Sequence, residues 1–173
     1  MKRAMLYLCV ISCLLCGCGE AKHAEAKQSG SKARRNEKII YRYLTDDMGL
    51  SRAAACGVLA NIYSESSFRP NVENDSGHYG LCQWGGIRRR RLIRYCRRKG
   101  YNYRTVSAQL RYMRFELRHY YPKVLKKLRS VRNSSRGAYK AGYYFCYHYE
   151  VPGNRARSSE RRGSLARRYY KKY

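Results

Sequence analysis

Residues 51–84 read SRAAACGVLANIYSESSFRPNVENDSGHYGLCQW, in which a small and apolar half is followed by a polar half rich in turn-forming residues. Its first half is apolar, and Glu65 is the only charged side chain in residues 53–68. With Ser51 as the N-cap, apolar residues recur at the i, i+3, i+4, i+7 spacing of a helix that turns one face to the core. The Arg69-Pro70 pair ends this helix, because the residue before a proline disfavours helical geometry. We therefore predict a core helix with Glu65 near its C-terminal end.

Glu65 continues the core-facing side of this helix, three residues after Ile62. Partial burial and the negative end of the helix dipole both disfavour a carboxylate at this position. A carboxyl group that keeps its proton near neutral pH can serve as a general acid. The alternative is a glutamate that points into water or pairs with Arg52 or Arg69.

Two segments together resemble the E-S-x-F-x-P…G-L-x-Q-W motif of the lysozyme-like superfamily, namely Glu65-Ser66-Ser67-Phe68-Arg69-Pro70-Asn71 and Tyr79-Gly80-Leu81-Cys82-Gln83-Trp84. Within that superfamily the chain is most similar to the phage tail lysozymes, which are related to the soluble lytic transglycosylases. The similarity runs from about Asn36 to Pro152. It implies a mainly α, α+β lysozyme-like fold, in which a short loop or hairpin segment follows the catalytic helix.

The resemblance also implies a reaction. Such proteins cleave peptidoglycan glycan strands between N-acetylmuramic acid and N-acetylglucosamine, as muramidases or as lytic transglycosylases, and need no cofactor or metal. The matching position makes Glu65 the catalytic acid. The resemblance also implies a set of substrate-binding residues, which are Ser66, Tyr79, Gly80, Leu81, Gln83, Trp84 and Tyr139. Tyr139 lies in an Ala-Tyr-Lys-Ala-Gly string that is similar to the A-Y-N-A-G string of transglycosylases, with Lys140 in place of Asn.

A second carboxylate would have to come from the loop after the helix, where Glu73 and Asp75 are the nearest acids in sequence. Asp75 is the better placed to position a water molecule or to stabilise a developing cation. The alternative is an aspartate that bonds to the backbone of its own turn. An inverting muramidase needs a second carboxylate at roughly 6.5–9.5 Å, whereas a one-acid transglycosylase needs Tyr139 instead. The sequence does not choose between these mechanisms.

The charge of the chain predicts a polyanionic partner. Lysine and arginine outnumber the acids 38 to 11, which gives a net charge of +27. Attraction of this kind depends on charge rather than on polymer identity, so a peptidoglycan wall with anionic polymers and a nucleic acid both fit. The alternative to an enzyme is therefore a non-catalytic cationic protein that binds the wall or nucleic acid. Arg88 to Arg91, at the start of a predicted helix over 88–99, are expected to face outward and to strengthen wall binding.

The N-terminus indicates export. Lys2 and Arg3 precede a short apolar run that ends in Leu15-Cys16-Gly17-Cys18, which resembles a lipobox. We predict a signal peptide over 1–18 with membrane attachment through a lipidated Cys18, a flexible tether over 19–35 and a peptidoglycan-cleaving domain over 36–173. A conventional cleavage site further along and an uncleaved anchor are the alternatives. An exported protein, whether in the cell envelope or secreted, rarely meets nucleic acid, so no specific nucleic-acid partner is expected.

Further helices are predicted over 106–120, after Pro122, from Ser135 to Val151 and from about Ser158. The predicted domain holds four cysteines, which are Cys56, Cys82, Cys96 and Cys146. Because export leads to an oxidising space, we expect them to form two disulfides, for which three connectivities exist. The alternative is a set of four buried free thiols. His78, His119 and His148 show no metal-binding spacing.

Overall fold

The structure is a computed structural model that describes residues 28–173. The predicted signal peptide and Cys18 lie outside these residues. One structural unit ends at Arg35, and a second comprises Asn36–Tyr173. Residues 28–35, the described part of the range predicted as a flexible tether, are helical. Lysine, alanine and arginine favour helices even without an apolar face. Within residues 28–173, no helix combines the length and the apolar character needed to cross a membrane.

The second unit is mainly α, as predicted. After a π-helical turn, η1 (Tyr43–Asp47), its elements are α2 (Arg52–Ser66), α3 (Gly86–Arg98), α4 (Val106–His119), α5 (Pro122–Ser130), α6 (Ser135–Phe145), the π-helical turn η2 (Cys146–Glu150) and α7 (Arg155–Lys172). Among the residues that the structure describes, the only strand pairing consists of isolated bridges from Tyr79 to Glu73 and to Trp84. The loop segment predicted after α2 is therefore present, with a minimal hairpin.

Local sequence signals explain most of these helix boundaries. The Ser51 hydroxyl accepts a hydrogen bond from the amide of Ala54 at 3.3 Å and caps α2. Pro122 opens α5, where its missing amide is not needed. Several boundaries differ from the prediction, and α3 begins at Gly86 rather than at residue 88. Ser134, rather than Ser135, caps α6, and α7 begins at Arg155, three residues before Ser158.

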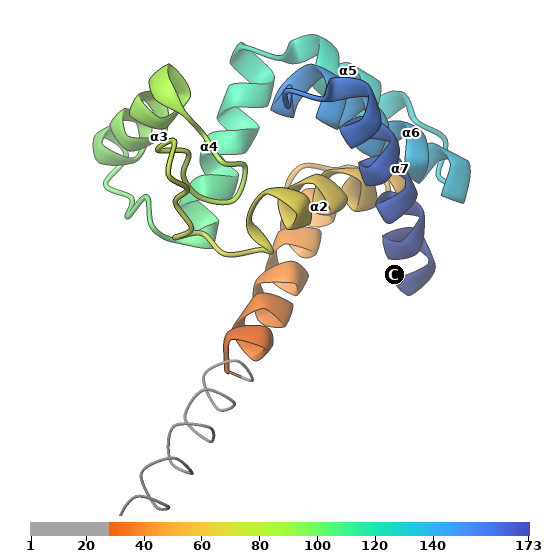
Figure 1. Ribbon diagram of the computed structural model, residues 1–173, viewed down its shortest axis with the longest axis horizontal. Helices are drawn as coiled ribbons and strands as arrows, with labels where there is room; N and C mark the ends of the chain where they lie inside the picture. Colours follow the sequence, from red (N-terminus) through yellow and green to blue (C-terminus); the bar gives the residue numbers. More distant parts are fainter. Residues whose placement is uncertain (1–27) are drawn as a thin grey trace, which may run out of the picture. The chain divides into compact units, whose positions relative to one another are not determined.

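The central helix is α2, against which α6 and α7 pack (Figure 1). Every residue from Ala53 to Ile62 is buried, so the helix is covered on all sides rather than on one face. Small residues permit this packing. A Cβ atom at Gly57 would lie 2.5 Å from the Cβ atom of Ala141 and 2.6 Å from the amide of Gly142 on α6. The predicted single apolar face therefore understates the burial of α2.

The four cysteines of this unit are buried free thiols, which corrects the prediction of disulfides. They lie on different elements: Cys56 on α2, Cys82 in the loop after it, Cys96 on α3 and Cys146 in η2. Each contributes to the apolar packing, and the Cys82 sulfur lies 3.9 Å from the Met113 sulfur. Burial raises the pKa of Cys56 to about 12 and that of Cys96 to about 11. Both thiols are therefore protonated at neutral pH.

Candidate active site

Glu65 lies where α2 emerges from the core. The continuous buried run of the helix ends at Ile62, Tyr63 and Ser64 are exposed, and the side chain of Glu65 keeps 18% of its surface exposed. Ser67 ends the helix two residues later with a left-handed backbone, at a φ angle of 50°. The burial of α2 thus presents one carboxylate at the boundary between the core and solvent.

Arg162 on α7 forms an ion pair with Glu65. Its Nη2 atom lies 2.6 Å from Oε1 of Glu65, and its side chain is 10% exposed. The Nη1 atom of Arg162 donates a hydrogen bond to Asn61 at 3.1 Å, and the Asn61 amide donates to the carbonyl of Gly142 on α6 at 3.0 Å. Three helices therefore fix the cation beside Glu65. The predicted alternative partners are placed elsewhere, since Arg52 stacks on Tyr170 and Arg69 bonds to the carbonyl of Ser66.

A second glutamate belongs to the same electrostatic cluster. Glu150 ends η2, and its Oε1 atom is buried without a hydrogen-bond partner. Burial and then the charge of Glu65 raise the pKa of Glu150 well above its usual range, although Arg88 and Arg162 act in the opposite direction. Two carboxyl groups therefore share the field of Arg162. Glu150 keeps its proton at pH values where an exposed glutamate is ionised.

The motif residues after α2 hold the loop close to Glu65. The Ser66 hydroxyl donates to the carbonyl of Leu81 at 3.1 Å, which ties the loop to the last turn of α2. Gly80 has a φ angle of 77°, and a Cβ atom there would lie 2.6 Å from the Gln109 side chain. That side chain accepts a hydrogen bond from the amide of Leu81 at 2.8 Å. Gln83 donates to two loop carbonyls at 3.1 Å each. These four motif residues therefore shape the loop.

Tyr79 and Trp84 are buried in the packing behind this loop. The Tyr79 hydroxyl donates to Asn71 at 2.9 Å, and the Trp84 indole donates to Glu116 on α4 at 2.9 Å. Trp84 has no exposed surface. Its position supports the loop from inside, and the predicted contact of Trp84 with a saccharide has no surface on which to occur in this conformation.

Glu116 is the polar centre of this packing. Its carboxylate accepts hydrogen bonds from Arg88, Tyr149 and Tyr112 as well as from Trp84. Burial opposes its ionisation, but Arg88 and the hydrogen bonds from Tyr149 and Trp84 together lower the pKa of Glu116. Arg88 is thus turned inward, which corrects the prediction that it faces solvent. Arg89 is also engaged, in an ion pair with Glu73 at 2.5 Å.

Asp75 and Tyr139 have neighbours other than Glu65. Asp75 is exposed in its turn, where Asn74 accepts the backbone hydrogen bonds that close the turn. Tyr139 lies under the guanidinium of Arg167, 4.6 Å from the ring centre, and beside Gly163 of α7. Among residues 28–173, no hydrogen bond or ion pair joins either of them to Glu65. Their predicted catalytic and binding roles stay predictions.

The arrangement is suited to proton transfer. A partly exposed carboxyl group, a fixed cation and a shaped loop are the groups that the site provides. No three His, Cys, Asp or Glu side chains gather as metal ligands in the part of the chain that the structure describes.

Sequence reasoning missed Arg162, Glu150 and Glu116. The two glutamates are among only 11 Asp and Glu residues in a chain of 173, but five of the nine acids in residues 28–173 are exposed. Scarcity alone therefore does not mark an acid as buried beside a cation. Which cation it meets depends on helix packing, which the sequence pattern does not show.

Comparison with protein families gives one match. Residues 35–173 match the model of the family described as phage tail lysozyme. The matched range contains α2, the loop after it, η2 and α7, and so all residues of the cluster around Glu65. Among curated protein sequences, none matches this chain.

Proposed function

The chain belongs to the phage tail lysozyme family, and from this premise we propose that Glu65 is the general acid of a glycan-cleaving enzyme. The family consists of glycosidase-type enzymes that act on peptidoglycan. The proposed reaction is cleavage between N-acetylmuramic acid and N-acetylglucosamine. In it, Glu65 donates a proton to the leaving glycosidic oxygen, and an oxocarbenium-like state forms on the sugar.

The observation that carries this proposal is the position of Glu65. It is partly exposed, it lies in the last turn of a helix that is buried from Ala53 to Ile62, and it is held by Arg162 at 2.6 Å. A proton donor becomes a carboxylate as the reaction proceeds. A cation already in place stabilises that developing charge without reorganisation.

The oxocarbenium-like state has two fates. Capture by water gives a reducing end, and capture by the 6-hydroxyl of the same sugar gives an anhydro end. Glu150 is poorly suited to activate water, because its Oε1 atom is buried from solvent. Asp75 is exposed and stays the second carboxylate of the hydrolytic route.

Glu65→Gln is the direct test. Glutamine keeps the size of the side chain but cannot supply the proton, so we expect clearance of a turbid peptidoglycan suspension to fall ~10²- to 10⁴-fold. Glu160→Gln, on an exposed part of α7, is the matched control and should retain full activity. Retention of most activity in Glu65→Gln, with an unchanged circular dichroism spectrum, would contradict the proposed role.

Product analysis decides the mechanism. Mass spectrometry distinguishes reducing from anhydro ends in the wild-type digest. Asp75→Asn should match Glu65→Gln in severity if the enzyme is an inverting muramidase, and should be milder if it is a transglycosylase. A wild-type protein that binds sacculi but releases no fragments would instead be the non-catalytic wall-binding protein.

A further inference from the structure

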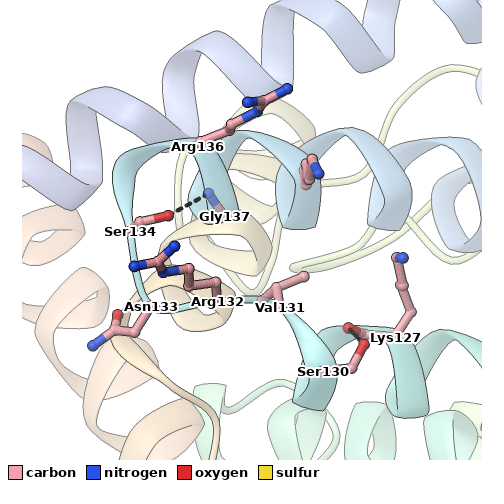
Figure 2. A pocket seen from close by; sticks show the side chains of 9 residues that line it. Lys127, Ser130, Val131, Arg132, Asn133, Ser134, Arg136 and Gly137 are labelled. Carbon is pink, nitrogen blue, oxygen red and sulfur yellow. Dashed lines mark hydrogen bonds between the residues drawn. The ribbon is translucent and has the colours of Figure 1, made fainter.

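A cationic cavity lies between α5 and α6, away from Glu65. Its volume is about 720 Å³, and four of its nine lining residues are Lys127, Arg132, Arg136 and Lys140. None of the nine is acidic and none is aromatic. Figure 2 shows Lys127 rising from α5 on one side, Arg132 from the connecting loop on the other, and Arg136 from the first turn of α6. One surface thus collects four cations from three consecutive segments.

These cations have no carboxylate partners. Within residues 28–173, the ion pairs join Arg88, Arg89, Arg162 and Lys172 to glutamates, and none includes a lysine or arginine of this cavity. Their charge is therefore uncompensated. An anion that enters the cavity gains attraction from all four side chains, and the positive N-terminal end of the α6 dipole adds to it.

The backbone around the cavity is held in shape before any ligand binds. Ser134 accepts a hydrogen bond from the amide of Gly137 at 3.1 Å, which Figure 2 shows as a dashed line. A Cβ atom at Gly137 would lie 1.8 Å from the carbonyl oxygen of Arg132, so the loop lies directly against the helix. Asn133 also accepts from the amide of Ala53, and its carbonyl accepts from Tyr170. A preformed site spends less binding free energy on ordering itself.

The cavity is separate from the candidate active site. Its loop contacts α2 at Ala53, whereas Glu65 lies twelve residues later on the same helix. At 1.5 Å per residue, the two positions are about 18 Å apart along the helix axis. A glycan strand bound for cleavage at Glu65 therefore does not account for the cations at the other end of α2.

We propose that this cavity binds a phosphodiester polymer of the cell envelope. Arginine forks pair with phosphate oxygens in two-point contacts, and lysines add charge. A single phosphate would leave most of 720 Å³ empty, whereas several repeat units of a polymer would fill it. Single-stranded nucleic acids bind through bases that stack on aromatic side chains. The lining of this cavity has none, whereas Tyr139, Tyr143 and Tyr144 line an adjoining hollow that shares Lys127 and Lys140 with it. Because the four cations gather where the lining has no aromatic side chain, we assign the cavity a polymer that has phosphates without bases, and the competition experiment tests nucleic acid against it.

The inference that the protein meets this polymer in the cell wall rests on the proposed function. The binding test is designed so that it does not depend on cleavage. The full chain carries Glu65→Gln throughout, so sacculi stay intact. A site variant replaces Lys127, Arg132, Arg136 and Lys140 with Gln. A control variant replaces Arg157, Arg161, Arg168 and Lys171 with Gln, which removes the same charge from exposed positions on α7. Thermal melts confirm that both variants fold.

We expect the site variant to bind sacculi that carry the phosphodiester polymer at least tenfold more weakly than its parent, and the control variant less than threefold more weakly. The slope of log affinity against log salt should fall by about 2.8 in the site variant, at about 0.7 for each of four lost contacts. Sacculi stripped of the polymer with hydrofluoric acid should bind both variants equally. If both variants lost the same affinity for intact sacculi, or if neither lost affinity, the proposed site would be wrong.

Competition identifies the ligand. A soluble polyol phosphate should displace the parent protein from intact sacculi at lower phosphate concentration than single-stranded DNA or inorganic phosphate does at matched ionic strength. Equal competition by DNA, or full competition by inorganic phosphate, would overturn the choice of polymer. Cleavage of soluble glycan fragments by the site variant with Glu65 restored should equal wild type. A failure of the proposed function would show there, and not in the binding measurements.

Discussion

Replacing Glu116 with Gln tests the buried network that holds the loop after α2 against α3, α4 and η2. The side chain of Glu116 has no exposed surface. Arg88 donates to both of its oxygens, through Nε at 2.8 Å and Nη2 at 2.9 Å. A glutamine amide therefore places its NH2 group against an Arg88 N–H in either orientation. The variant also leaves Arg88 without a charge partner.

Breaking a buried ion pair by removing one partner costs ~3–5 kcal/mol of unfolding free energy, which for a domain of this size lowers Tm by roughly 10–20 °C. The measurement is urea unfolding followed by circular dichroism at pH 7. The difference in unfolding free energy between wild type and Glu116→Gln should shrink as the pH is lowered. Because the folded-state pKa of Glu116 is lowered, the stability from its ionised form is present above the unfolded pKa of ~4.3 and lost as pH falls through the folded value.

Two comparisons make this result decisive. Glu160→Gln removes an exposed carboxylate from α7 and should change the unfolding free energy by less than ~0.5 kcal/mol. Adding Arg88→Met to Glu116→Gln removes the unpaired cation and should recover part of the loss. A loss below ~1 kcal/mol in Glu116→Gln, with an unchanged m-value, would refute the role of the network.

Three further outcomes follow from the structure. Glu150→Gln should become more stable relative to wild type as pH rises from 4 to 8. The reason is that the pKa of Glu150 is raised in the folded state, so wild type loses stability as pH rises from the unfolded pKa to the folded pKa. A pH-independent difference in the free energy of urea unfolding would contradict this. Gly57→Ala should lose ~1–3 kcal/mol by forcing α2 away from α6, whereas Gly153→Ala, which meets no atom within 4 Å, should be nearly neutral in the same assay. Cys56 and Cys96 should react slowly with iodoacetamide at pH 8 until the protein is denatured, since burial holds their pKa values at about 12 and about 11, and rapid labelling of native protein in peptide mapping would count against their burial.

The predictions that the structure confirms rest on interactions between residues that are close in the sequence. The run of small and apolar residues from Ala53 to Ile62 forms the predicted helix, and Ser51 caps it as expected. Glu65 lies in its last turn because the following residues leave helical geometry. The mainly α class follows in the same way from caps, prolines and apolar spacing along the chain. These signals act between residues a few positions apart, so they are visible in the sequence.

The environment of each acid was decided only by tertiary packing. Arg162 reaches Glu65 because α7 packs against α2, and Glu150 is buried because η2 packs against α7. Arg88 belongs to a run of four arginines with the same local pattern, yet it alone turns inward to Glu116. The cysteines follow the same rule, since pairing needs two sulfurs to meet and these four lie on different elements. The sequence by itself determined the helices and the position of Glu65 along one of them. Charge pairing and burial depend on distances between residues far apart in the chain, and only the folded structure sets those distances.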